Sequence, residues 1–255
     1  MKTSDSFLRR MLRYFKLNRL CKTIKILLPA SVVDLITNLS RKNVYIPHVL
    51  QKELEPKYAS AWRVVRRRIT RIGDYLEFGV SRGDAMACMY RVLRKQRLSS
   101  VRLFGFDSFK EFPSFDATND AITWQSGQHA TTIEQTTQFL NRARINWRRV
   151  LLINGRFDDT LNPQTTDKYN IRKASIIMIA CNMYPAAKAA LNYSLPLIID
   201  YTIIFFNDWR EDTTLGECQA LSEFLRENKH LTCDFLGDYK PTGKIFLVTN
   251  TEYVW

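Results

Sequence analysis

Two short segments of this sequence carry the residue types that hold a nucleoside ligand. The segment 77-EFGVSRG-83 contains the carboxylate of Glu77 and two glycines, Gly79 and Gly83. Glycine lets a backbone turn sharply and approach a ligand closely, and a nearby carboxylate can act on an amino group. Asp107 ends the next apolar run, where a carboxylate can accept both hydroxyls of a ribose. The three-glycine spacing of dinucleotide sites is missing, so the pattern favours S-adenosylmethionine.

The cysteines and histidines indicate no metal or disulfide chemistry. The chain has five cysteines, with no C-x-x-C pair, and three histidines that lie far apart in the sequence. A histidine-based zinc site needs closer spacing, and a disulfide framework needs a different pattern. We therefore expect reduced thiols in a cytoplasmic protein.

Strands and helices alternate after residue 71, and this order predicts what positions the two segments. Alternation of this kind indicates an α/β fold: a Rossmann-like, doubly wound, mostly parallel sheet, with a terminal antiparallel strand pair joined through Gly237 and residues 241–243. Such sheets bind ligands beyond the carboxyl ends of their strands. The expected strands are 74–80, 101–107, 149–155, 174–180, 201–208, 231–236 and 244–250, and the expected helices are 85–95, 132–146, 185–195 and 216–228.

The N-terminal region is distinct in charge, and we divide the chain into residues 1–71, a basic helical region or lid, and residues 72–255. Residues 1–28 hold eight Lys or Arg and one Asp, which is +7 of the total +13. Within residues 7–16, apolar and basic side chains fall on opposite faces of a helix. Residues 7–28 could contact an anionic membrane peripherally, or this helix could pack on the domain or seal a homodimer. No run is long enough to span a membrane, and we identify no convincing signal peptide.

A second basic patch lies in 61-AWRVVRRRITR-71. Nucleic acid binding would call for aromatic stacking residues or a known motif beside it, and we see neither. A solvated helix face is the better interpretation, so nucleic acid is not an expected partner.

Three segments resemble one family. They are 76-LEFGVSRGDA-85, 104-FGFDSFKEFP-113 and 155-GRFDDTL-161, and 127-GQHATT-132 and 216-GECQALSEF-224 also fit. They are similar to the macrocin O-methyltransferase family, a branch of the class I S-adenosylmethionine-dependent methyltransferases, over about residues 72–250. The resemblance implies that S-adenosylmethionine is held by Glu77, Gly79, Ser81, Gly83, Asp107 and Ser108, with Phe109, Gly155 and Phe157 near its adenine.

The chain departs from this family where a divalent cation is expected. Members commonly read Ile-Asp-x-Asp-x-Tyr after the fourth strand and Asp-Asp after the fifth, and three of these carboxylates bind the cation. Here Ala180 and Asn182 replace the first pair, and Asn207 precedes the remaining Asp208. Hard cations need several oxygen ligands, usually with carboxylates among them. We therefore expect no tightly held magnesium or calcium.

Three interpretations follow, and we favour the first. The protein transfers methyl groups to a small molecule or glycan without metal, with Asp208 and His129 as candidate bases and with Tyr184 and Trp209 shaping the acceptor pocket. Alternatively it has lost catalysis and acts as a binding or regulatory protein of the same fold. In the third, the cofactor serves other chemistry, or the acceptor is an amine or carboxylate. A solvated loop position would also explain His129, and a capping role in a helix or loop would also explain Asp208.

Overall fold

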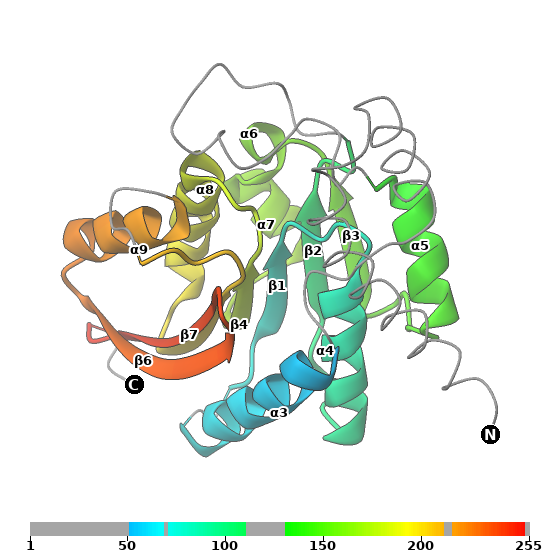
Figure 1. The fold of residues 1–255 in the computed structure, drawn as a ribbon, viewed down its shortest axis with the longest axis horizontal. Helices are drawn as coiled ribbons and strands as arrows, with labels where there is room; N and C mark the ends of the chain where they lie inside the picture. Colours follow the sequence, from blue (N-terminus) through cyan, green and yellow to red (C-terminus); the bar gives the residue numbers. More distant parts are fainter. Residues whose placement is uncertain (1–50, 69–70, 111–130, 212–215, 253–255) are drawn as a thin grey trace, which may run out of the picture. The chain divides into compact units, whose positions relative to one another are not determined.

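The computed structural model describes residues 51–68, 71–110, 131–211 and 216–252 of the 255-residue chain (Figure 1). The predictions for residues 7–28, for the N-terminal helices before residue 51 and for His129 lie outside these described residues.

A seven-stranded sheet forms the centre of the described part of the chain. Its order is β3-β2-β1-β4-β5-β7-β6, and every neighbouring pair is parallel except β5–β7 and β6–β7. This confirms the predicted α/β class and the terminal antiparallel pair. The strands are β1 (Asp74–Phe78), β2 (Leu103–Asp107), β3 (Val150–Asn154), β4 (Ala174–Ile179), β5 (Tyr201–Phe206), β6 (Leu231–Lys240) and β7 (Gly243–Asn250).

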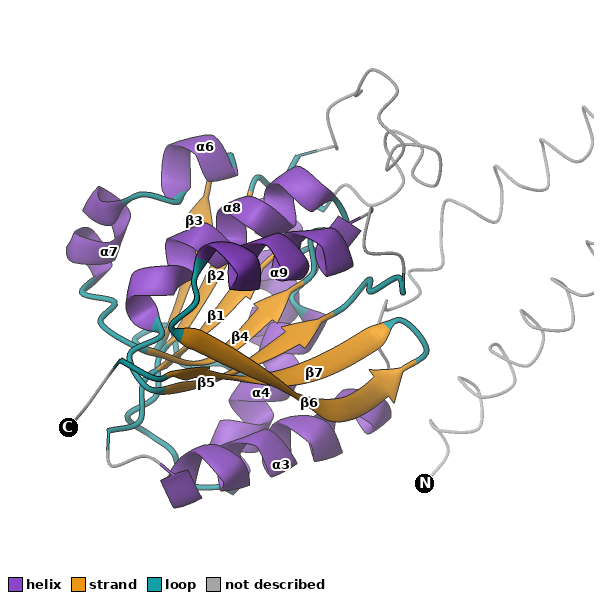
Figure 2. Ribbon diagram, turned by 90° about the vertical axis from the view of Figure 1, so that its left-hand side faces the viewer, coloured by secondary structure: helices purple, strands orange, loops and turns teal. Residues whose placement is uncertain are grey.

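Helices cover both faces of the sheet, which explains why its central strands are apolar runs (Figure 2). Every residue of β1 and of β4 is buried, as parallel strands between two helical layers must be. One face packs against α3 (Gln51–Arg68), α4 (Asp84–Lys95) and α5 (Ile133–Arg142), and the other against α6 (Phe157–Thr160), α7 (Pro163–Tyr169), α8 (Tyr184–Ser194) and α9 (Gly216–Glu227).

Helix α3 belongs to the core of this sheet. Its side chains Tyr58, Trp62 and Val65 are at most 2 % exposed and pack beside α4. Full burial of one large apolar side chain contributes about 1.5–3 kcal/mol, so this helix is firmly attached. The arginines on its other face, Arg63 and residues 66–68, are exposed, which confirms the solvated face predicted from the sequence.

The structure corrects several element boundaries. Gly237 does not join β6 to β7 but lies inside β6 at a register shift, with a φ of 128°, so the pair is a longer hairpin than predicted. The helix expected at 132–146 ends at Arg142, because the chain turns there and reaches Arg144 in the left-handed region. The short helices α6 and α7 were not predicted. In the described part of the chain, the helices are all too short or too polar to cross a membrane.

Candidate cofactor and acceptor site

The strands β1 and β4 lie side by side at the centre of the sheet, and their carboxyl ends carry the two loops of the candidate site. Gly79 has a φ of 89°, and its N–H donates to the carbonyl of Phe106 at 2.9 Å. A Cβ atom on Gly79 would lie 2.2 Å from the carbonyl oxygen of Ala180. Only glycine fits this position, because it combines a left-handed φ with a backbone-to-backbone contact.

Helix α5 packs against the rest of the glycine loop and hydrogen-bonds to it. Gly83 is the N-cap of α4 with a φ of 89°, and a Cβ atom there would meet the side chain of Leu140 at 3.1 Å. The hydroxyl of Thr136 donates to the carbonyl of Ser81 at 2.6 Å. The loop is therefore a preformed turn at the N-terminus of α4, which is a favourable place for a polar ligand.

Asp107 connects the glycine loop to the loop after β2. Its Oδ2 accepts from the N–H of Ser81 and its Oδ1 from the N–H of Phe109, both at 2.8 Å. Ser81 and Phe109 each have a φ of 49°, so the carboxylate stabilises two turns of unfavourable backbone. A carboxylate offers about four acceptor sites, so two remain for ribose hydroxyls. Capping a turn and binding a ribose are compatible roles here.

The other predicted cofactor residues gather around Asp107. Ser108 follows it and is half-buried, and the Phe109 ring is buried in the core. The N–H of Gly155 donates to the carbonyl of Asp107 at 3.0 Å. Phe157, at the start of α6, meets the ring of Phe78 edge-on at 6.1 Å. The fold thus brings the residues of three strand ends together, and their roles toward the cofactor stay predictions.

Glu77 lies on the side of β1 that faces α3, in a hydroxyl-rich but otherwise apolar environment. Its side chain is 1 % exposed, and Tyr75 donates to its Oε2 at 2.6 Å. The pKa of Glu77 is raised to about 8: burial is the largest cause, the Tyr75 hydrogen bond opposes the increase, and the carboxylates of Asp107 and Asp84 add to it. The Tyr58 hydroxyl lies 2.9 Å from that of Tyr75.

Sequence reasoning missed both tyrosines of this hydrogen-bonded series, Tyr58 and Tyr75. One signal was present for Tyr75, because residues two apart on a strand share a face. There was no such signal for Tyr58, which comes from a helix outside the alternating region.

The loops after β4 and β5 hold the second half of the candidate site, centred on Asp208. The amide Nδ2 of Asn207 donates to Asp208 Oδ2 at 3.0 Å. The amide of Asn182 also faces this carboxylate, and with its nitrogen turned inward it donates to Oδ1 at 3.3 Å and to Oδ2 at close range. Two neutral amides therefore face Asp208 where the sequence resemblance leads one to expect a cation, and the ammonium of Lys240 also interacts electrostatically with this carboxylate.

The residues at the expected cation position do not fit a hard metal ion. The side chain of Ala180 has no atom that could bind a cation, and the Oδ1 of Asn207 accepts a hydrogen bond from the Tyr239 hydroxyl at 3.1 Å. Within the described ranges, no group of three His, Cys, Asp or Glu side chains is arranged to hold a metal. Hard cations prefer sets of charged oxygen ligands, and this donor set lacks them.

Glu217 is a buried acid next to Asp208 that sequence reasoning missed. It lies in the first turn of α9, is 0 % exposed, and accepts the backbone N–H of Asp208 at 2.9 Å through Oε2. Burial raises the pKa of Glu217 well above its ordinary value, and the charge of Asp208 raises it further. Acidic residues in first turns are common helix features, so the sequence alone could not distinguish this one.

Tyr184 and Trp209, the predicted acceptor-pocket residues, are both engaged in packing. The Tyr184 hydroxyl donates to Glu223 Oε2 at 2.5 Å and accepts from Lys188 Nζ at 3.1 Å, which connects α8 to α9. Trp209 is 9 % exposed and its ring contacts that of Phe246, with centroids 5.1 Å apart. These contacts do not test whether either residue touches an acceptor.

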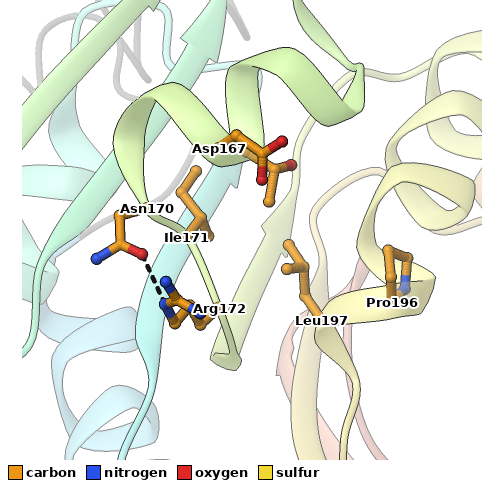
Figure 3. Close-up of a pocket in the computed structure, with 7 residues that line it drawn as sticks. Asp167, Asn170, Ile171, Arg172, Pro196 and Leu197 are labelled. Atoms are coloured by element: carbon orange, nitrogen blue, oxygen red, sulfur yellow. Dashed lines mark hydrogen bonds between the residues drawn. The ribbon is translucent and has the colours of Figure 1, made fainter.

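A separate hollow of about 330 Å³ lies at the other end of the sheet (Figure 3). Arg172 lies two residues before the first residue of β4, whereas Ala180 directly follows the last one. Asn170 Oδ1 accepts from Arg172 Nε at 2.6 Å beside the hollow. The hollow is lined by Thr166, Asp167, Asn170, Ile171, Arg172, Pro196 and Leu197, none of which belongs to the candidate site.

Comparison with known proteins agrees with this geometry. The profile of the macrocin-O-methyltransferase (TylF) family matches residues 54–237. The O-methyltransferase NovP is similar in structure, with a TM-score of 0.62 at 18% identity over 76% of this chain and 78% of that one. The calicheamicin methyltransferase CalS11 is also similar, with a TM-score of 0.58 at 16% identity over 91% of both chains. The apo structure of CalS11, described as a TDP-rhamnose 3'-O-methyltransferase, has a TM-score of 0.54 at 18% identity over 91% of this chain and 92% of that one. No curated protein matches the sequence.

Proposed function

Because this chain belongs to the macrocin-O-methyltransferase family, we propose that it is an S-adenosylmethionine-dependent methyltransferase that modifies a small molecule or glycan without a divalent cation. The observation that supports the proposal most directly is the difference between the loops after β1 and β2 and the loops after β4 and β5. The glycine loop and Asp107 are complete, while Asp208 is compensated by the amides of Asn182 and Asn207.

The cofactor half of the site fits S-adenosylmethionine. Gly79 and Gly83 leave a backbone cradle that a side chain would fill, Asp107 keeps free acceptor sites for a ribose, and Glu77 offers a carboxyl group for the amino end. When bound, this cofactor supplies an electrophilic methyl group on a sulfonium. The chain's task is then to hold the acceptor in line with that group and to exclude water.

Asp208 is the described residue best suited to take the acceptor's proton. Transfer to a sulfonium carbon requires an aligned acceptor and one base, and a carboxylate can serve as that base. The two amide donors hold Asp208 in one orientation, and the N–H of Asp208 is held by Glu217. His129 stays a second candidate base, outside the described residues.

We further propose a sugar hydroxyl as the acceptor group. The family match supports it, as does the description of CalS11 as a TDP-rhamnose 3'-O-methyltransferase. An amine or carboxylate acceptor would need less activation than a hydroxyl, and the absence of cation ligands at Ala180 and Asn207 is consistent with that choice as well. Product analysis distinguishes the two.

One observation favours a second candidate, a cofactor-binding protein without catalysis. Both oxygens of Asp208 face amide donors, which occupy acceptor sites that an acceptor's hydroxyl would otherwise use. In this alternative the cofactor half retains its ligand and the protein works through a binding partner.

The experiment is to incubate the full chain with methyl-labelled S-adenosylmethionine and an extract containing small molecules and glycans, with and without EDTA. The proposal expects label in a product fraction, equal in both conditions, and its loss in Asp208→Asn. EDTA-sensitive transfer would contradict metal independence. Cofactor binding by calorimetry without transfer would favour the second candidate.

The setting of the reaction is also a proposal. We propose a cytoplasmic protein whose basic residues 7–28 contact a membrane surface peripherally and whose N-terminal region contributes to a homodimer. Sedimentation with anionic vesicles should weaken when residues 1–28 are deleted, and unchanged sedimentation would exclude this segment as the anchor. Light scattering of the full chain measures the oligomeric state.

A further inference from the structure

Glu77 is a buried acid whose described neighbours leave it without a compensating cation. Its side chain is 1 % exposed, and its Oε2 accepts a hydrogen bond from a neutral hydroxyl, that of Tyr75, at 2.6 Å. An isolated carboxylate in such a place is costly, because burial removes its hydration. Such a group stays protonated until a positive charge arrives.

The groups that face Glu77 come from every element packed around it, and they are neutral or acidic. Tyr75 lies on β1, Tyr58 on α3 and Tyr239 on β6, and all three hydroxyls are themselves buried. The carboxylates of Asp107 on β2 and Asp84 on α4 oppose its ionisation, as its burial does, and Cys88 on α4 is buried too. A cationic ligand group is the missing partner.

We propose that Glu77 releases its proton when the ammonium group of the cofactor binds, and that Tyr75 and Tyr58 are positioning residues that hold its carboxylate for this exchange. The proposal rests on the proposed function, because it needs a ligand that carries an amino group. The balance is simple: the Glu77 carboxyl loses one proton to solvent, and the resulting carboxylate pairs with the ligand's ammonium.

The two tyrosines form a directional chain toward Glu77. When Tyr75 donates to Glu77, its oxygen is left to accept, and the Tyr58 hydroxyl lies 2.9 Å away in the right place to donate. The Tyr58 and Tyr75 rings also meet edge-on, with centroids 5.9 Å apart, so neither hydroxyl can move far. This chain stabilises the ionised form of Glu77, and it makes α3 part of the cofactor site.

The exchange has a clear pH dependence. The pKa of Glu77 in the ligand-free protein, raised by burial to about 8, sets the window. Below it, binding must expel the proton, so affinity rises about tenfold per pH unit and levels off above pH 8. At pH 7, which lies below this pKa, most Glu77 side chains are protonated, so ligand binding should release protons, and the number released should fall as the pH rises.

The test is calorimetric titration of the full chain with S-adenosylhomocysteine, which carries the same amino group and needs no acceptor. Titrations at pH 7 in phosphate and in Tris, which differ in ionisation enthalpy, count the released protons, and a series from pH 6 to 9 gives the affinity profile. We expect buffer-dependent heats and the rising profile. Glu77→Gln should bind S-adenosylhomocysteine more weakly, with heats that do not depend on the buffer. Any pH dependence that remains in this variant measures the titration of the ligand's own amino group.

The tyrosine variants separate positioning from structure. Tyr75→Phe removes a donor that favours the carboxylate, so its affinity profile should level off at a higher pH than that of the wild type, and Tyr58→Phe should show a smaller shift in the same direction. Tyr193→Phe is the matched control, because Tyr193 is buried but hydrogen-bonds Thr166, and its profile should not move.

Two results would overturn the inference, and they differ from failure of the proposed function. Binding of S-adenosylhomocysteine with a flat profile and buffer-independent heats would show that Glu77 does not exchange a proton. A proton release that persists in Glu77→Gln would assign it to another group. No binding at any pH would instead remove the proposed function itself.

Discussion

The two halves of the candidate site are built on different physical principles. At the ends of β1 and β2, the site depends on backbone conformation: glycines at positive φ, a close approach to Ala180, and a carboxylate that accepts two backbone N–H groups. At the ends of β4 and β5, it depends on side-chain contacts: two amides donate toward Asp208, and the buried Glu217 accepts the backbone N–H of Asp208.

This difference shows which half can change during divergence. A backbone cradle tolerates few substitutions, because a single added carbon collides with the neighbouring strand end. A side-chain cluster can exchange a cation for amide donors, since both satisfy the same carboxylate. The chain therefore keeps the expected cofactor half and departs from the family pattern in the acceptor half.

The largest effect should come from Gly79→Ala. The new Cβ would lie 2.2 Å from the Ala180 carbonyl at a φ of 89°, so we expect a loss of about 3 kcal/mol or more in unfolding free energy and no measurable binding of S-adenosylhomocysteine. Urea unfolding and calorimetry measure both. Gly237→Ala is the matched control, with positive φ but no atom within 4 Å, and it should cost less and leave binding intact. Equal losses in the two variants would contradict the clash argument.

Asp107→Ala should have the next largest effect. Together with Asp208→Ala, it tests whether cofactor affinity depends on the cofactor half alone. It removes the acceptor of two backbone N–H groups, each worth about 1.5–3 kcal/mol when the partner is charged, so we expect at least about a 100-fold loss of cofactor affinity. Asp208→Ala is the comparison in the other half and should bind S-adenosylhomocysteine within about twofold of the wild type. A large loss of affinity in Asp208→Ala would show that the two halves act as one.

Placing carboxylates at positions 180 and 207, where the family pattern has them, should make the acceptor half bind magnesium. In Ala180→Asp with Asn207→Asp, Asp208 loses an amide donor and gains acidic neighbours, so unfolding free energy should fall by about 1–3 kcal/mol without metal. Millimolar magnesium should recover the loss, as a thermal shift would show. Asn207→Asp alone is the control and should respond less. An equal magnesium shift in the wild-type protein would mean that the amide cluster does not replace a cation.

The smallest effect should come from Tyr184→Phe. It removes a hydroxyl that connects Glu223 and Lys188 at a partly exposed helix contact, so the unfolding midpoint should move by no more than about 3 °C. Methyl transfer should stay close to the wild-type rate if the hydroxyl acts only between α8 and α9. A strong fall in transfer with an unchanged midpoint would return Tyr184 to the acceptor pocket, as the sequence predicted.

Much of this architecture could be predicted before the structure was known. The apolar runs of β1 and β4 and the glycines after β1 are local signals, because strand burial and positive φ depend on residues close together in the chain. Asp107 could be placed for the same reason, since it ends a strand. Gly237 was misread as a turn because a bulge glycine and a turn glycine look alike in sequence.

The sequence by itself determined the fold class, the family and the glycine loop proposed to hold the cofactor, since each depends on short segments whose conformation is set by neighbours along the chain. Only the tertiary structure decided how Asp208 is compensated, that Glu217 lies behind it, and that Tyr58 reaches Tyr75 and Glu77. Those contacts join residues from separate elements, and their existence depends on side-chain direction and burial. Both arise when the helices pack on the sheet, and neither can be read from spacing.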